Sequence, residues 1–258
     1  FNFADCVIAP DGCTMINRCV ENMELLKTMG QGNDRFFHQY MEIPLKADEN
    51  GVELLKLQCR NHILTPLREA YGIDTSDAAI RTAVAGHNEI CSLIRAIGDF
   101  REEERPRITG YEFHVIELVS QVCPHYLIKP YLEETLEELK TREPEEKFPF
   151  RAKVVLVGSE IDDPDFTKLV ESCGAMVVAD RYCYGAVESR IPIVVKEGQE
   201  PLDAIARHYL DTSNCPRFMP QDIMRERKQR LADLAKEYKA DGIIVASNKF
   251  CEYWSYER

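Results

Sequence analysis

Three short apolar runs lie far apart in the chain, and each ends in alanine with a cysteine close behind it. The runs are Val7–Ala9, Met176–Ala179 and Ile243–Ala246, and they are followed by Cys13, Cys183 and Cys251. Apolar runs of this length are typical of buried strands. In open α/β sheets, ligands bind at the carboxyl ends of the strands. The pattern therefore predicts three thiolates at sheet edges, converging on one soft metal centre.

Segments resembling strands and helices alternate in the first and last parts of the chain. Residues 1–50 predict the C-terminal part of a first α/β domain, residues 51–147 a helical segment and linker, and residues 148–258 a second α/β domain. Alternation at this spacing is typical of parallel sheets with helices on both faces. We expect two doubly wound, flavodoxin-like domains with a helical insertion, the first domain being incomplete.

The helical segment carries recognisable start and stop signals. Thr109 and Glu112 have the spacing of a capping box, which predicts a helix running toward Val122. Pro130 suits the first position of a helix over 131–142. Pro66 predicts a kink in a helix over 52–71.

Charge and hydropathy disfavour some partners. The net charge is −12 and the 32 Lys and Arg residues form no cluster, which disfavours a nucleic-acid partner and an anionic membrane surface. No apolar run approaches the ~20 residues of a membrane span. The first residues show no secretory signal pattern, so we expect a cytoplasmic protein.

Ten cysteines are many for 258 residues, and most have an ordinary explanation. Without a secretory leader, reduced thiols are favoured over disulfides. Cys59 and Cys91 fall on apolar helical stripes, where a cysteine behaves as a small core residue. We expect Cys19 to face the core as well.

Three widely separated cysteines suit an iron–sulfur cluster better than structural zinc, which is usually held by four ligands in tight pairs. Three protein thiolates would leave one iron with an open position, as a catalytic cluster requires. On spacing alone, scattered structural cysteines remain the alternative.

Several neighbours of these cysteines are candidates for lining the site. Tyr182 and Tyr184 bracket Cys183, and Trp254, the chain's only tryptophan, follows Cys251. Such aromatic residues would exclude water from a cluster, or they are ordinary packing. Glu160 follows another predicted strand and either lines the same crevice or caps the next helix.

The sequence lacks several common catalytic motifs. It contains no GxxxxGK[ST] loop, no GxGxxG after a strand and no GxSxG elbow. We therefore expect that the chain does not itself hydrolyse ATP.

Six segments, in order, resemble the 2-hydroxyacyl-CoA dehydratase and benzoyl-CoA reductase subunits, of the 2-hydroxyglutaryl-CoA dehydratase D-component type. They are DCVIAPDGCT, RITGYE, VLVGSEIDDPDF, GAMVVADRYCYG, PLDAIARHYL and DGIIVASNKFCEYW. The similarity extends over nearly the whole chain, which makes it more specific than any one motif.

The resemblance implies a 4Fe–4S cluster between two α/β domains, held by cysteines that correspond to Cys13, Cys183 and Cys251. It also implies a heterodimer with a homologous second subunit, and a separate ATP-dependent iron–sulfur activator protein. In the dehydratases, one electron enters the thioester carbonyl of a 2-hydroxyacyl-CoA. The resulting ketyl radical eliminates water, giving an enoyl-CoA and making the enzyme a lyase. Neither a catalytic base nor a CoA contact is assigned by the resemblance.

Two alternatives remain beside a dehydratase subunit. A benzoyl-CoA reductase-type subunit would be an oxidoreductase that reduces an aromatic acyl-CoA with the same activator chemistry. A non-catalytic partner subunit would relay electrons or act as a scaffold within the heterodimer.

Overall fold

The computed structural model describes residues 4–31, 36–144, 149–183, 190–212, 216 and 221–255, apart from the side chains of residues 221–224. The chain divides into two compact units. Unit 1 comprises Phe1–Thr82 and Val194–Asp211, and unit 2 comprises Ala83–Ile193 and Thr212–Arg258. Each unit contains a small, wholly parallel sheet, so the predicted α/β class is confirmed. The division at residues 50 and 147 stays a prediction.

Unit 1 is built on one strand–helix–strand motif. Strand β1 (Cys6–Pro10) pairs in parallel with β2 (Phe37–Met41), and helix α1 (Thr14–Thr28) lies between them in the chain. Gly30 follows α1 at a φ of 73°, a left-handed conformation that glycine adopts without strain.

The remaining helices of unit 1 show how Pro66 acts. Helix α2 (Glu49–Cys59) passes through a π-helical turn (Arg60–Leu64) into α3 (Thr65–Tyr71). Pro66 stands in the first turn of α3. A proline ring clashes with the carbonyl four residues before it, and one π-turn relieves such a clash. The predicted kink thus takes the form of a π-turn immediately before the proline.

Helix α8 (Pro201–Thr212) also belongs to unit 1, and ion pairs join it to α2. Arg207 contacts Glu49 at 2.7 Å, and Lys56 contacts Glu200, the residue just before α8, at 3.1 Å. Ion pairs near the surface contribute at most about 1 kcal/mol each.

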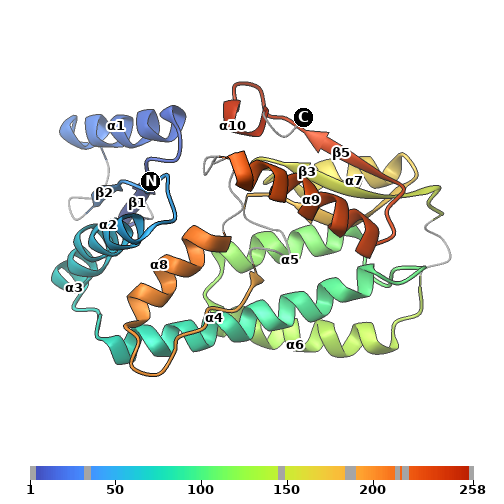
Figure 1. Ribbon diagram of the computed structural model, residues 1–258, viewed down its shortest axis with the longest axis horizontal. Coiled ribbons are helices and arrows are strands. Elements are labelled where there is room, and N and C mark those ends of the chain that lie inside the picture. Colours follow the sequence, from blue (N-terminus) through green and yellow to red (C-terminus); the bar gives the residue numbers. More distant parts are fainter. Residues whose placement is uncertain are drawn as a thin grey trace. The chain divides into compact units, whose positions relative to one another are not determined.

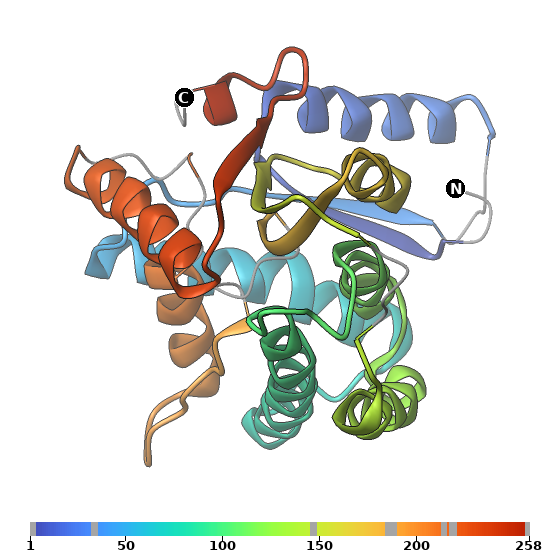
Figure 2. The same cartoon turned by 90° about the vertical axis from the view of Figure 1, so that its right-hand side faces the viewer.

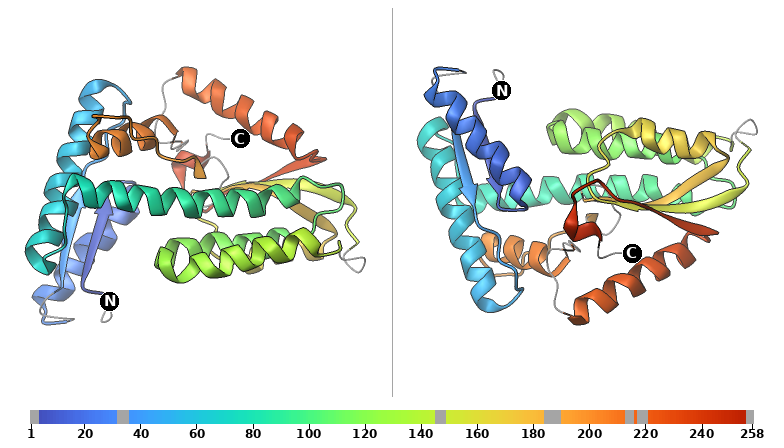
Figure 3. Two further views of the ribbon diagram at one scale, coloured as in Figure 1. Left: turned by 90° about the horizontal axis from the view of Figure 1, so that it is seen from below. Right: turned by 90° about the horizontal axis from the view of Figure 1, so that it is seen from above.

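Unit 2 has a helical layer made of the later part of α4 (Asp77–Gly98), together with α5 (Gly110–Val122) and α6 (His125–Thr141). Figures 1 and 3 show α4 and α6 running alongside each other. Their shared core is apolar, and its buried members are Ile90, Ile94, Ile97, Ile108, Phe113, Ile128, Leu132 and Leu139. None of the described helices is long and apolar enough to cross a membrane.

The start of α6 differs from the prediction. The helix begins at His125 and contains Pro130 within it, rather than beginning at Pro130. Ile128 is only 4% exposed, because the turn before the proline packs into the helical core. Burial of that turn outweighs the one hydrogen bond that a proline cannot donate.

The sheet of unit 2 has the order β4-β3-β5, with β3 (Ala152–Gly158) in the centre between β4 (Ala175–Arg181) and β5 (Gly242–Ala246). Helices α7 (Pro164–Ser172) and α9 (Gln221–Glu237) cover opposite faces (Figures 1 and 2). Alternate residues of β3 accordingly enter different cores. Val155 and Val157 pack with α9, while Val154 and Leu156 pack with α7.

Strand β4 continues to Arg181, two residues beyond the predicted apolar run. Its extra length depends on Asp180, which is 2% exposed and forms a 2.7 Å ion pair with the buried guanidinium of Arg101. A charged residue is compatible with a buried strand when it is paired in this way.

A buried carboxylate joins β4 to two helices. Glu171, in α7, accepts hydrogen bonds from the backbone N–H groups of Gly110, Tyr111 and Val177. The first two open helix α5, and Val177 lies beside a register shift between β3 and β4. Thr109 and Glu112 complete the predicted capping box, which is confirmed.

Two cysteines that the sequence predicts to lie in the core, Cys91 and Cys19, differ in their burial. Cys91 is fully buried, as predicted, and its Sγ lies 3.3 Å from His87 Nε2. The prediction for Cys19 is wrong, because Cys19 is exposed. On α1 only Val20 is buried, so the buried face of this helix is narrower than its sequence indicates.

We expect Gly110→Ala to lower the free energy of unfolding by about 1–3 kcal/mol, the usual cost of overpacking. A Cβ at Gly110 would lie 2.5 Å from Val177 Cβ and 2.7 Å from Val177 O. Urea unfolding followed by circular dichroism measures the change.

Gly86→Ala is the matched control, because nothing lies within 4 Å of a Cβ at that helical glycine. This variant should be neutral, or more stable by up to about 1 kcal/mol, since alanine favours a helix. Equal effects of the two substitutions would contradict close packing at Gly110.

Candidate functional site

The carboxyl edge of the unit 2 sheet brings together three loops from distant parts of the chain. The chain passes from β3 to β4 on one side and then to β5 on the other, so its direction across the sheet reverses at β3. Ligands of open parallel sheets bind at such a reversal, outside the carboxyl ends of the strands. The loops after β3, β4 and β5 therefore form the candidate site.

Hydrogen bonds to the backbone tie these loops to one another. The N–H of Cys183 donates to Ser159 O at 3.3 Å, which links the end of β4 to the end of β3. The side-chain amide of Asn248 donates to Glu160 O at 2.9 Å, which links the loop after β5 to the same segment. Asn248 O in turn accepts from the N–H of Cys251 at 3.0 Å.

A side-chain contact connects the two cysteine-bearing loops directly. Trp254 lies in the short helix α10 (Glu252–Ser255), immediately after Cys251. Its indole Nε1 donates to the Sγ of Cys183 at 3.1 Å. Unit 2 thus places the Cys183 thiol beside the segment that carries Cys251.

The backbone just before Cys251 has an uncommon conformation. Phe250 has a φ of 70°, in the left-handed region that aromatic residues rarely adopt. Its side chain is 81% exposed, so it is not held there by core packing. Strain of this kind gathers where the surrounding structure fixes a functional loop, and here it directs the chain into Cys251.

Cys13 belongs to unit 1. It follows β1, is half-buried and has the extended backbone of an N-cap residue, with its side chain making no cap hydrogen bond to α1. Asp11 in the same turn bridges the strand ends, donating its N–H to Met41 O and accepting from Ile43 N. The N-terminus of a helix favours negative charge, which suits an anionic sulfur.

Glu160 follows the central strand and lies beside this network. The residue is exposed overall. Protein atoms nevertheless surround the carboxyl group, and this partial desolvation raises the pKa of Glu160. The negative charge of Asp162 adds a smaller rise. It does not cap the next helix, because Asp163 is the N-cap of α7 and accepts from Asp165 N. The capping alternative for Glu160 is therefore wrong.

Tyr182 is 4% exposed and its hydroxyl points into the core. It lies 3.1 Å from the Thr167 hydroxyl, which lies 2.8 Å from His114 Nδ1. His114 Nε2 contacts the Ile161 carbonyl at 2.7 Å and must donate to it, so Nδ1 is the acceptor. Burial lowers the pKa of His114, in agreement with this neutral tautomer. Tyr184 lies outside the described residues.

The donor set fits an iron–sulfur cluster in its chemistry. Soft thiolates are the ligands of such clusters, and hydrogen bonds to the sulfur adjust their potential. Cys183 and Cys251 belong to unit 2, and Cys13 belongs to unit 1. Across the ranges that the structure describes, no three His, Cys, Asp or Glu side chains form a metal-binding group.

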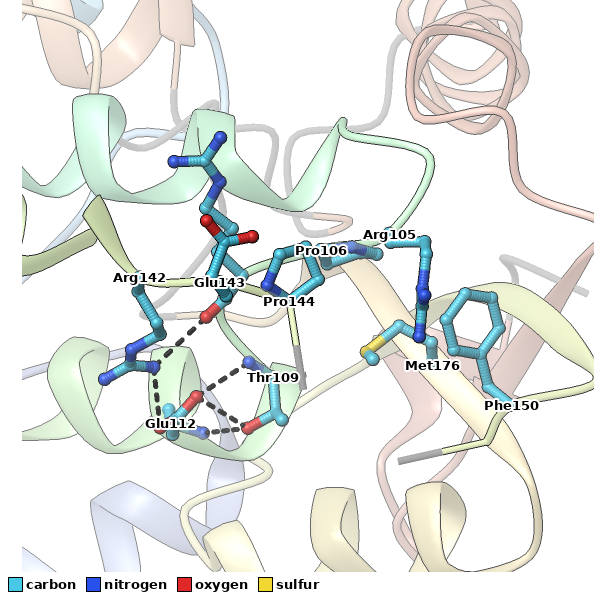
Figure 4. Close-up of a pocket in the computed structure, with 10 residues that line it drawn as sticks. Arg105, Pro106, Thr109, Glu112, Arg142, Glu143, Pro144, Phe150 and Met176 are labelled. Atoms are coloured by element: carbon cyan, nitrogen blue, oxygen red, sulfur yellow. Dashed lines mark hydrogen bonds and ion pairs between the residues drawn. The ribbon is translucent and has the colours of Figure 1, made fainter. Parts of the chain in front are cut away.

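A cavity of about 300 Å³ in unit 2 lies at the opposite edge of the sheet (Figure 4). Phe150 precedes β3 and Met176 is near the start of β4, so this hollow adjoins the amino ends of the strands. Arg142, on its wall, already pairs with Glu112 at 3.0 Å. The cavity is therefore separate from the cysteine-bearing edge.

A buried charged cluster underlies β4, and sequence reasoning missed it. Glu117 of α5 is fully buried, and its carboxyl lies within hydrogen-bonding reach of Asp180. Neither oxygen of Glu117 meets a donor among the described residues, and the same holds for Asp180 Oδ1. Two carboxyl groups can share a hydrogen bond only if one of them keeps its proton. The charged pair Asp180-Arg181 after an apolar run was the available sequence signal.

Burial, reinforced by the negative charge of Asp180, raises the pKa of Glu117 well above its usual value. The opposing effect of Arg101 and Arg190 is smaller. A raised pKa favours the protonated, neutral form of the Glu117 carboxyl in the folded protein.

A parallel α/β unit with cysteines at the carboxyl edge of its sheet belongs to the class of α/β proteins that bind ligands at strand ends. Comparison with known families narrows this class. The chain matches the family described as 2-hydroxyglutaryl-CoA dehydratase, D-component, over residues 1–258, and it belongs to that family.

Two curated relatives are similar to the chain. The (R)-phenyllactyl-CoA dehydratase beta subunit of Clostridium sporogenes is 24% identical over 252 residues, which is 95% of this chain and 64% of that protein. A benzoyl-CoA reductase subunit of Thauera aromatica is 21% identical, over 100% of this chain and 64% of that protein. The chain thus spans 64% of the length of each relative.

We expect Glu117→Gln to change the pH dependence of stability. The unfolded carboxyl titrates near 4.5 and the folded one higher, so the native state binds more protons between those two values. The contribution of Glu117 to stability is full below pH 4.5 and is lost as the pH rises through the folded pKa, by up to about 1.4 kcal/mol per pH unit. Glutamine supplies the same donor without titrating, so the variant should lack this loss.

Urea unfolding between pH 4 and pH 9 measures the difference. Glu134→Gln, at an exposed position of α6, is the control and should follow the wild type. If the curves of Glu117→Gln and wild type stay parallel throughout, Glu117 does not carry the proton.

Proposed function

We propose that the chain is the cluster-bearing part of a 2-hydroxyacyl-CoA dehydratase subunit, a lyase that forms an enoyl-CoA by radical elimination of water. Membership of the family over all 258 residues carries this proposal. The cysteine-bearing edge of the unit 2 sheet supports it, because the thiols lie where such sheets bind ligands. The flavodoxin-like character of the complete domains is part of the same proposal.

Cys13, Cys183 and Cys251 would hold a 4Fe–4S cluster. When bound, the cluster would supply one-electron chemistry to the thioester of the substrate. Around it, Trp254 orients the sulfur of Cys183, and its ring excludes water on that side. Glu160, whose backbone carbonyl accepts from Asn248 in the loop after β5, is a candidate to line the same site.

The proposed partners follow from the same family. The two relatives are named as subunits, which supports a heterodimer with a homologous second subunit. An ATP-dependent iron–sulfur activator would deliver the electron, as the family resemblance implies, and the lack of a GxxxxGK[ST] phosphate loop in the sequence agrees with this division of labour. An acyl-CoA is the proposed substrate class.

A benzoyl-CoA reductase-type subunit is the second candidate, favoured by the similarity to the Thauera aromatica protein. An electron-relay subunit is a third, and it predicts a cluster that never meets substrate. The full enzyme, supplied with activator, ATP and a reductant, distinguishes them by product. A dehydratase yields an enoyl-CoA, a reductase yields a ring-reduced CoA ester, and a relay subunit tolerates blockage of its own cluster's open position.

Anaerobic purification tests the cluster itself. We expect about four irons and about four acid-labile sulfides per chain, and a sharp fall in both for Cys183→Ser, because a cubane needs its thiolates. Iron and sulfide assays with absorption spectra measure this.

Cys173→Ser is the matched control. Cys173 is an exposed cysteine of unit 2 that ends α7, away from the carboxyl edge of the sheet. This variant should keep the wild-type iron content. A colourless, iron-free wild-type preparation would reject the proposed cofactor.

A further inference from the structure

The indole of Trp254 is buried, and its hydrogen-bond acceptor is unusual. Trp254 is 5% exposed, and its Nε1 donates to Cys183 Sγ at 3.1 Å. A buried indole N–H normally finds an oxygen acceptor. A neutral thiol is a weak acceptor, whereas a sulfur with negative charge, such as a metal-bound thiolate, accepts strongly. A metal-bound sulfur at Cys183 would therefore accept this hydrogen bond more strongly than a free thiol.

The position of the indole is fixed from several sides. Its ring belongs to the core formed by β3, β4 and α9, which includes Val155, Val157, Met176, Val178, Leu234 and Tyr238. The guanidinium of Arg227 in α9 lies 5.8 Å from the ring centroid and is itself 1% exposed. Arg181 Nη1 donates to Arg227 O at 3.3 Å, which ties that part of α9 to the end of β4.

This packing fixes the direction in which the indole N–H of Trp254 points. A ring held by two strands and a helix cannot turn to follow a moving sulfur, so the sulfur is held by the ring. The indole also joins the loop after β4 to the segment after β5, because Trp254 and Cys251 share one loop and helix.

We propose that Trp254 is a positioning residue that orients Cys183 and withdraws electron density from its sulfur, raising the reduction potential of the cluster bound there. This inference rests on the proposed function. Hydrogen bonds to cluster sulfurs stabilise the more negatively charged reduced state, so removing one makes the potential more negative.

The main experiment compares the anaerobically reconstituted full chain with Trp254→Phe, which keeps a ring and removes the N–H. We expect the iron content to be preserved, the midpoint potential to become more negative and the iron–sulfur stretching bands in resonance Raman spectra to shift. Trp254→His retains a ring N–H and should restore part of the shift. Tyr253→Phe, at the neighbouring 39% exposed residue, should leave potential and bands unchanged.

A second measurement needs no cluster. Because Trp254 is the only tryptophan, the fluorescence of the cluster-free chain reports on this indole alone. Cys183→Ala should shift the emission and change its intensity, since the Nε1 loses its acceptor. Cys173→Ala, at an exposed cysteine of the same unit, should leave the spectrum unchanged.

The outcomes separate the two proposals. A wild-type chain that binds no iron rejects the proposed function, and this inference with it. If the cluster-bearing wild type and Trp254→Phe have the same midpoint potential and the same Raman bands, the proposed function stands and this inference is wrong. Identical emission of wild type and Cys183→Ala likewise overturns it, whatever the cluster does.

Discussion

The carboxylate of Glu171 is the interaction on which the arrangement of unit 2 depends. It accepts N–H groups from the first turn of α5 and from Val177 in β4, and so fixes a helix and a strand to α7 at one point. Burial raises the pKa of Glu171, and these three hydrogen bonds oppose that rise. A carboxylate at a helix N-terminus also meets the positive end of the helix dipole. Gly110 permits the close approach because it has no Cβ.

With one side of β4 fixed in this way, the carboxyl edge of the sheet can hold irregular loops. Cys183 and Cys251 lie on these loops, which are connected through Ser159, Asn248 and Trp254. Phe250, just before Cys251, has a left-handed backbone, and a strained residue persists only where its surroundings are over-determined. Rigid strands thus support a loop-built candidate site.

Buried charge is the other constraint on this unit. Arg101, Asp180 and Glu117 lie together in the interior, where unpaired charges are costly. The ion pair between Arg101 and Asp180 makes a charged residue compatible with the buried end of β4, beyond its apolar run. That extension sets where Cys183 emerges, two residues after the strand ends. The ion pair therefore acts on the candidate site through the length of a strand.

Local sequence was sufficient to predict the α/β class, the capping box at Thr109 and the positions of strand-end cysteines, because strand patterning and helix capping involve near neighbours in the chain. It was also sufficient for the family, since similarity extends over the whole chain. The folded arrangement was needed to show that Pro130 lies within a helix, that Cys19 is exposed and that Trp254 contacts Cys183. These features depend on which surfaces pack together and on residues far apart in the chain. Neither hydrophobic period nor spacing encodes such contacts.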